Sequence, residues 1–136
     1  MLPFSIEIKH LEDYIKLEQM RFTNKIAFNY KIEVSDFLIP PLILQPLIEN
    51  SIKHGLLKKE CGGNINLTAS KEGKYIAITI KDDGVGFDTS KKFTNNSIGI
   101  ENVRFRLKNS INGMMDIESI INKGTTIIIV FPYLEV

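Results

Sequence analysis

Three polar side chains inside an apolar segment, residues 44–55, are the first candidates for chemistry in this sequence. At about 100° per residue, a helix would place Asn50, Lys53 and His54 within roughly one third of its circumference. The opposite side of the same helix would be apolar and would dock on a core through Leu44, Ile48 and Ile52. Because a neutral oxygen ligand beside a cation suits a phosphate chain that carries Mg²⁺, this segment predicts a phosphate-binding helix.

A carboxylate at the end of an apolar strand is the second candidate. The isoleucines at alternate positions of residues 76–80 share one face with Asp82, because strand side chains alternate. A carboxylate that ends a buried face needs a hydrogen-bond donor, and the amino group of adenine is one candidate. The alternative is that Asp82 only opens the turn at Asp83-Gly84, which is a common use of aspartate.

Three further segments contain glycine where backbone could approach a ligand. Gly84 and Gly86 alternate in the loop after this strand and could supply amide groups. Ser97 and Gly99 open a helix whose first amides could bind phosphate. Thr125 follows a glycine at the start of an apolar strand. Taken separately, these patterns are equally typical of turns, capped helices and hairpins.

The elements that must position these residues follow from periodicity and turn residues. We expect a first helix from Ser5, as its N-cap, to about Arg21. Next we expect a half-buried strand over 25–32, with one face formed by Ile26, Phe28, Tyr30 and Ile32. A helix started by Pro40-Pro41 should follow. The remaining expected elements are a strand after Gly62-Gly63, a strand Tyr75–Lys81, a loop Asp82–Asn96, a helix Ile98–Asn109 and strands Met114–Ile120 and Thr125–Phe131. This order predicts an α+β fold, with a mixed, mainly antiparallel sheet covered by helices on one face.

Length and composition limit the possibilities further. The 136 residues suit one domain, 1–136, and the formal net charge of +1 gives no argument for a nucleic-acid or membrane-surface partner. The only cysteine, Cys61, cannot form an internal disulfide, which favours a reducing compartment. Because Met1-Leu2-Pro3-Phe4 is unlike the start of a self-contained enzyme, we expect a piece of a longer protein.

The order and spacing of the four segments carry a family resemblance. Asn50 on a helix, the Asp82-x-Gly-x-Gly loop, the helix start at Gly99 and the Gly-Thr pair at 124–125 resemble the nucleotide-binding boxes of the GHKL ATPases and kinases. Residues 40–55 look like the N box of sensor histidine kinases related to autolysis and sugar-uptake regulators. The run 98–107, Ile-Gly-Ile-Glu-Asn-Val-Arg-Phe-Arg-Leu, is similar to the second glycine box of that subfamily, and the resemblance covers nearly the whole chain.

This resemblance implies roles for the candidate residues. Asn50 would ligate the Mg²⁺ that bridges the phosphates of ATP, and Lys53 and His54 would contact phosphate oxygens. Asp82 would accept a hydrogen bond from the adenine amino group. The other implied nucleotide contacts are Gly84 and Gly86 in the pocket wall, Ser97 and Gly99 at the helix start, and Thr125 beside adenine. The implied fold is a two-layer α/β sandwich of the Bergerat type, with residues 87–97 as a lid over ATP.

Two departures from the family pattern bear on activity. The hydrolytic relatives carry a glutamate four residues before the magnesium asparagine, where this chain has Pro46, so hydrolysis through that base is not expected. Asn95 and Ser97 also stand where relatives often have lid glycines, which predicts altered nucleotide affinity. Glu49 could be a base or could make a structural hydrogen bond, and both interpretations stay open.

The expected function is that of the catalytic domain of a sensor histidine kinase. His10 does not match the phosphoacceptor box and is expected to be solvated, so the phosphoacceptor histidine would lie on an upstream dimerisation domain of the same protein. The resemblance further implies a response regulator as partner, and a full-length homodimer anchored in a bacterial inner membrane with this domain in the cytoplasm. The alternatives are an interaction module with weak or no nucleotide binding, and a serine kinase like the anti-sigma factors, which the N-box wording disfavours.

Overall fold

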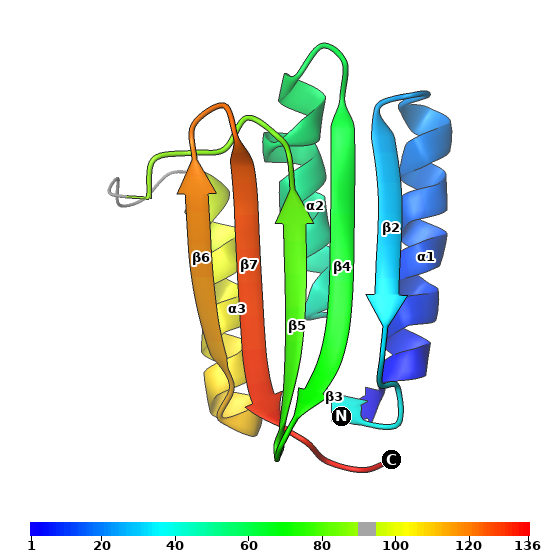
Figure 1. Ribbon diagram of the computed structural model, residues 1–136, viewed down its shortest axis with the longest axis vertical. Helices are drawn as coiled ribbons and strands as arrows, with labels where there is room; N and C mark the ends of the chain where they lie inside the picture. The colour runs from blue at the N-terminus through cyan, green and yellow to red at the C-terminus, as the bar shows by residue number, and fades with distance from the viewer. Residues whose placement is uncertain (90–94) are drawn as a thin grey trace.

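A twisted five-stranded sheet and three long helices form the two layers of this protein (Figure 1). The computed structural model describes residues 1–89 and 95–136, with side chains described from residue 99 in the second range. The helices are α1 (Phe4–Arg21), α2 (Leu44–His54), the short η1 (Leu56–Lys58) and α3 (Asn95–Ile111). The strands are β1 (Leu2–Pro3), β2 (Ile26–Ile32), β3 (Leu38–Ile39), β4 (Gly63–Glu72), β5 (Tyr75–Asp82), β6 (Met114–Ile120) and β7 (Gly124–Pro132).

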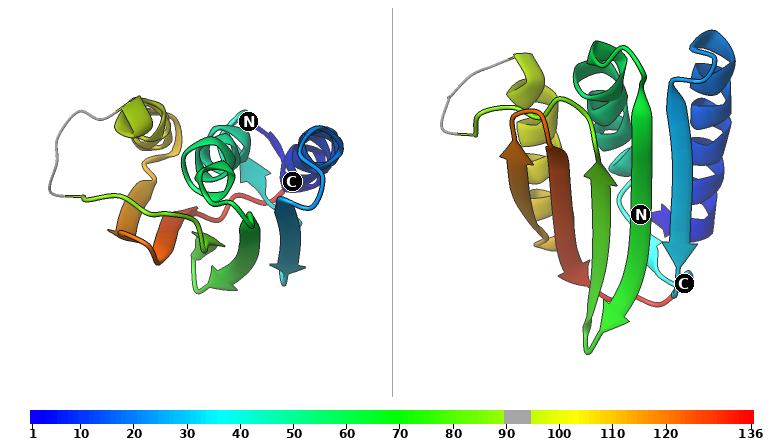
Figure 2. Two further views of the ribbon diagram at one scale, coloured as in Figure 1. Left: turned by 90° about the horizontal axis from the view of Figure 1, so that it is seen from above. Right: turned by 45° about the horizontal axis from the view of Figure 1, so that its top comes forward.

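The main sheet has the strand order β2-β4-β5-β7-β6. Strands β2 and β4 are parallel, while the other three neighbouring pairs are antiparallel. Seen from above in Figure 2, α1, α2 and α3 lie side by side over one face of the sheet. The predicted α+β fold, a mixed and mainly antiparallel sheet with helices on one face, is therefore confirmed. The two-residue strands β1 and β3, which pair with each other, were not expected from the sequence.

The core fills the space between the two layers. Alternate residues of the central strands point toward the helices and are buried: Ile65, Leu67 and Ala69 on β4, Ile76, Ile78 and Ile80 on β5, and Ile127, Ile129 and Phe131 on β7. The facing side chains come from the apolar sides of the helices: Leu11 and Ile15 on α1, Leu44, Ile48 and Ile52 on α2, and Ile100, Val103 and Leu107 on α3. Burial of this apolar surface is the main force that holds the helices on the sheet.

Two predicted helix starts are wrong. Helix α1 begins at Phe4 after Pro3, so Ser5 lies inside the first turn and does not cap it, and the Phe4 amide donates instead to the Phe37 carbonyl. Helix α2 begins at Leu44 and not at Pro40-Pro41, because Leu42 has a positive φ of 56° that reverses the chain before the helix. In both places, the helix begins where the surrounding fold requires it and not at the residue that local sequence preference favoured. Among the described residues, no helix has both the length and the apolar character that a membrane span requires.

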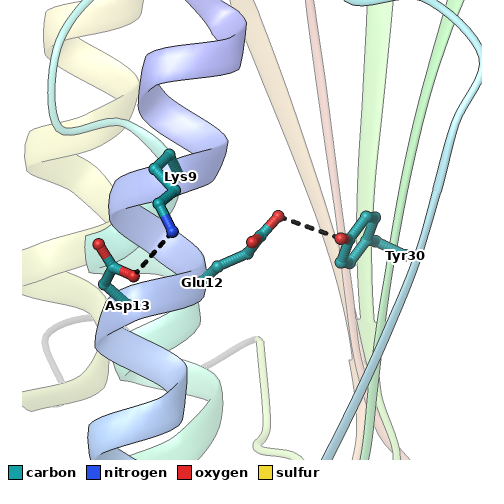
Figure 3. Close-up of polar contacts among 4 residues, drawn as sticks. All are labelled: Lys9, Glu12, Asp13 and Tyr30. Carbon is teal, nitrogen blue, oxygen red and sulfur yellow. Dashed lines mark hydrogen bonds and ion pairs between the residues drawn. The ribbon is translucent and has the colours of Figure 1, made fainter.

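Strand β2 forms one edge of the sheet and is joined to α1 by a polar contact. Its face with Ile26 and Phe28 turns toward the helix layer, as predicted. Tyr30 shares that face but keeps 49% of its surface exposed, and its hydroxyl donates to the Glu12 carboxylate at 3.0 Å, as Figure 3 shows. The neighbouring Lys9–Asp13 pair on α1 is exposed, so it adds little to stability.

Candidate functional site

The end of β5 brings the carboxylate predicted from the sequence to the inner face of the sheet. Asp82 is the last residue of β5 and pairs with Thr125 on β7 and Ile65 on β4. Only 4% of Asp82 and 8% of Thr125 is exposed. Strand alternation therefore placed Asp82 correctly in the row of buried isoleucines, and the register of β5 and β7 puts it next to Thr125.

Hydrogen bonds hold the Asp82 carboxylate in a defined position. Its Oδ1 accepts from the Gly84 amide at 2.9 Å. Burial raises the pKa of Asp82, and hydrogen bonding by the Gly84 amide, the Ser51 side chain and the Thr125 amide opposes that rise. Ser51 is itself buried and belongs to α2, so this carboxylate lies where α2 meets the end of β5 and the start of β7.

The three predicted polar residues of α2 occupy its last two turns. Asn50 and His54 are half-buried, while Lys53 is exposed. The Nδ1 atom of His54 is buried and has no hydrogen-bond partner among the residues that the structure describes. Burial lowers the pKa of His54, and the nearby charges of Lys58 and Lys53 lower it further, which favours a neutral imidazole. This end of α2 therefore offers an amide, a cation and an uncharged imidazole.

Glycines allow the end of α2 and the loop after β5 to pack backbone against backbone. A Cβ atom added at Gly84 would lie 2.5 Å from the Cα of Gly55, the residue that follows α2. One added at Gly86, which has a φ of 66°, would lie 2.1 Å from the carbonyl oxygen of Ile120. Both predicted glycines are thus required for close approach between segments. The contribution of Gly55 was not recognised in the sequence, although it ends the same apolar motif.

Ser119 on β6 is a polar residue of this region that sequence reasoning missed. Its Oγ is 2.8 Å from Oγ1 of Thr125 and accepts from the Phe87 amide at 2.8 Å. It also donates to the Gly124 carbonyl at 3.2 Å. The hairpin turn before Thr125 could have indicated this, since it places Ser119 directly opposite Thr125 in the register of β6 and β7. Ser119 therefore connects the start of β7 to the chain that leaves β5.

The predicted phosphate-binding helix start differs from expectation. Helix α3 begins at Asn95, before the expected start at Ile98, so Ser97 and Gly99 lie within its first two turns. Gly99 is exposed, and a Cβ atom added there would meet nothing within 4 Å. The Ser97 side chain and residues 90–94 of the expected lid lie outside the part of the chain that the structure describes. Gly99 is thus not required for packing against a described neighbour.

A protein-built metal cage is absent from the described residues, since no three His, Cys, Asp or Glu side chains converge there. Mg²⁺ does not need such a cage, because it commonly uses one or two protein ligands together with phosphate oxygens and water. His10 is exposed on α1, as predicted, and Glu49 accepts a hydrogen bond from the Gln45 side chain at 3.3 Å, which agrees with its structural interpretation. What the geometry offers is a buried acceptor at Asp82 and an amide, a cation and an imidazole at the end of α2.

Comparisons with known proteins agree with this arrangement. A family model described as "Histidine kinase-, DNA gyrase B-, and HSP90-like ATPase" matches residues 39–135. The uncharacterised protein YwpD of Bacillus subtilis is 34% identical over 132 residues, which cover 91% of this chain and 48% of that protein. The sensor protein LytS of Staphylococcus epidermidis is 30% identical over 140 residues, or 93% of this chain and 24% of that protein. The chain thus spans less than half the length of either relative.

A solved structure shows the same fold. Histidine kinase ThkA in complex with the response regulator protein TrrA superposes with a TM-score of 0.70 at 16% identity, over 98% of this chain and 41% of that one. At this identity, the likeness concerns the arrangement of helices and strands.

Proposed function

Because the chain belongs to the family of histidine kinase-, DNA gyrase B- and HSP90-like ATPases, we propose that it binds Mg-ATP and supplies the γ-phosphate for phosphorylation of a histidine. The observation that carries this proposal is the buried Asp82 carboxylate beside Thr125, at the end of the helix that presents Asn50. A buried acceptor of this kind suits the amino group of adenine, since the pair satisfies both partners.

The other groups fit a phosphate chain with its metal ion. Asn50 would provide the protein's oxygen ligand to Mg²⁺, and Lys53 would neutralise phosphate charge. The buried Nδ1 of His54, which has no partner among the described residues, leaves that ring with hydrogen-bonding capacity for a phosphate oxygen or water. When bound, Mg-ATP supplies the transferable phosphoryl group. Residues of this chain hold and orient it, which is the main requirement of phosphoryl transfer.

Pro46 supports transfer to another protein group over hydrolysis. It is the third residue of α2, where its missing amide costs no intrahelical hydrogen bond, so the helix tolerates it. A proline ring cannot take a proton from water. We therefore propose that the γ-phosphate goes to a histidine of an upstream dimerisation domain of the same protein, and that a response regulator receives it next. The full-length protein would be a membrane-anchored bacterial homodimer with this domain in the cytoplasm.

Calorimetric titration with Mg-ATP tests the proposal. Wild type should release or absorb heat with a single-site isotherm, and Asp82→Asn should weaken binding roughly 10- to 100-fold, the effect of losing a charge-assisted hydrogen bond. Asn50→Ala should remove the difference between titrations with Mg²⁺ and with EDTA. If wild type and Asp82→Asn both show no heat, the domain is an interaction module and not a kinase domain.

A further inference from the structure

The first turn of α2 has no local cap. Ile43 occupies the N-cap position and makes no side-chain hydrogen bond to the helix, as expected for an apolar residue. Pro46, the third helical residue, has no amide hydrogen to satisfy. The helix that carries the proposed phosphate-binding residues therefore depends on another part of the chain for its first amides.

Glu7 of α1 supplies that missing cap. Its Oε1 accepts from the amides of Ile43 at 3.2 Å and Leu44 at 3.4 Å, although 36 residues separate Glu7 from Ile43 in the chain. Glu7 is only 4% exposed, so its carboxylate is held among these partners inside the fold. A carboxylate at a helix N-terminus is also favoured by the helix dipole.

Both ends of α2 are consequently anchored to other elements. Glu7 holds its first turn to α1, and the close contact of Gly55 with Gly84 holds its last turn to the loop after β5. Figure 1 shows α2 running behind the sheet, away from β3 and toward the end of the molecule where β5 finishes and β7 begins. Each helical residue adds about 1.5 Å along the axis and 100° around it, so slippage at the first turn would displace and rotate Asn50, Lys53 and His54.

We infer that Glu7 is a positioning residue for the nucleotide site, acting through α2 without touching the ligand. This inference rests on the proposed function, since it concerns the placement of the same Asn50, Lys53 and His54. Loss of the Glu7 acceptor leaves two buried amides unsatisfied at the start of α2, and the helix must move or fray to expose them to water. The displacement would reach Asn50, Lys53 and His54, farther along the same helix, and would lower the affinity for Mg-ATP.

The experiment compares three variants of this chain by calorimetry with Mg-ATP and by amide hydrogen exchange. Glu7→Ala removes the acceptor, and Glu7→Gln keeps one oxygen in place. Leu11→Ala removes buried packing from the same helix α1 but leaves the hydrogen bonds from Glu7 to the first turn of α2 in place. We expect Glu7→Ala to weaken Mg-ATP binding about fivefold or more and to speed exchange at Ile43 and Leu44. Glu7→Gln should remain within about twofold of wild type.

Leu11→Ala separates positioning from general stability. It should lower the melting temperature while leaving the affinity of the folded protein unchanged. Equal losses of affinity in Glu7→Ala and Leu11→Ala, or wild-type affinity in Glu7→Ala, would overturn the inference. If Glu7→Ala does not fold, Glu7→Asp, which withdraws the carboxylate by one methylene, gives the same comparison. If wild type binds no Mg-ATP, the proposed function fails. In that case, the NMR amide chemical shifts of Asn50, Lys53 and His54 still test the inference, because they should change in Glu7→Ala and not in Leu11→Ala.

Discussion

The two carboxylates at the end of β5 are neighbours in the chain, but they lie in opposite environments. Asp82 is 4% exposed and faces α2, whereas Asp83 is exposed and faces the start of β4. Asp83 accepts from the Asn64 amide at 2.7 Å and from the Asn64 side chain at 3.0 Å, while Lys59 donates to its carbonyl. Neighbouring residues thus place one carboxylate on the buried face of the sheet, toward α2, and the other in an exposed contact with the start of β4.

The contrast extends to the proton affinities of the two groups. Burial raises the pKa of Asp82, which makes its charged form costly in the free protein. Partial burial also raises the pKa of Asp83, but hydrogen bonds from Asn64 and the charge of Lys59 outweigh this effect and hold that pKa below the ordinary value. The charged form of Asp82 therefore costs stability, while the hydrogen bonds of the charged Asp83 stabilise the fold.

The largest effect is expected where the backbone of Asp82 meets Gly124. An alanine Cβ at Gly124, which has a φ of 121°, would lie 2.1 Å from the Asp82 carbonyl oxygen. We expect Gly124→Ala to lower the free energy of unfolding by more than about 3 kcal/mol in urea denaturation. Gly73→Ala is the matched control, because Gly73 also has a positive φ, of 62°, but has open space around it, so it should cost only about 1 kcal/mol. Equal losses of stability in the two variants would mean that the positive φ alone sets the cost, and that the contact with Asp82 adds nothing.

The preference for one nucleotide base should distinguish the two carboxylates most directly. Inosine triphosphate has an oxygen where ATP has the amino group, so wild type should prefer ATP by roughly tenfold or more, the effect of an unpaired buried acceptor. Asp82→Asn should remove most of this preference and Asp83→Asn should keep it. Competitive titration of the two nucleotides measures the ratio of their affinities. If Asp83→Asn, and not Asp82→Asn, abolishes the preference for ATP, the adenine contact belongs to Asp83 and our assignment is wrong.

The pH dependence of stability should differ in direction between the two residues. With a raised folded pKa, the stabilising contribution of Asp82 is complete below about pH 3.9 and is lost as the pH rises through the folded value. With a lowered folded pKa, the contribution of Asp83 is present above about pH 3.9 and is lost as the pH falls through its folded value.

Unfolding in urea at a series of pH values measures both contributions. Relative to wild type, Asp82→Asn should gain stability as the pH rises above about 4, by at most about 1.4 kcal/mol per pH unit. Asp83→Asn should be less stable at neutral pH and should approach wild type in stronger acid. Parallel pH profiles for the two variants would contradict the opposite environments described here.

The smallest effect is expected at Ser119. Ser119→Ala removes the contacts with Thr125 and the Phe87 amide but leaves Asp82 in place. Mg-ATP affinity should fall only about three- to fivefold, since each neutral hydrogen bond contributes roughly 1 kcal/mol. Ser110→Ala on the exposed side of α3 is the control and should bind as wild type does. An effect as large as that of Asp82→Asn would show that Ser119 contacts the ligand itself.

Much of the fold and part of the candidate site could be predicted from local patterns. Alternation along β5 placed Asp82 inside, and helical periodicity placed Ile48 and Ile52 on the core side of α2 with Asn50 away from it. Helix starts were less predictable. Ser5 is a good cap by type, but α1 begins at Phe4, after Pro3, because the Phe4 amide has a partner at Phe37. At this helix start, a hydrogen bond between distant segments outweighed the local capping preference of serine.

The apolar faces, the alternation of the strands and the residue types that end them could all be predicted from local sequence, because they depend on neighbours within a few positions. The three-dimensional packing was needed to show that Glu7 caps α2 and that Gly55 packs on Gly84. Each of these contacts joins different segments of the chain. They depend on the register and packing of whole helices and strands. Burial of the common core fixes that packing, and no local sequence pattern specifies it.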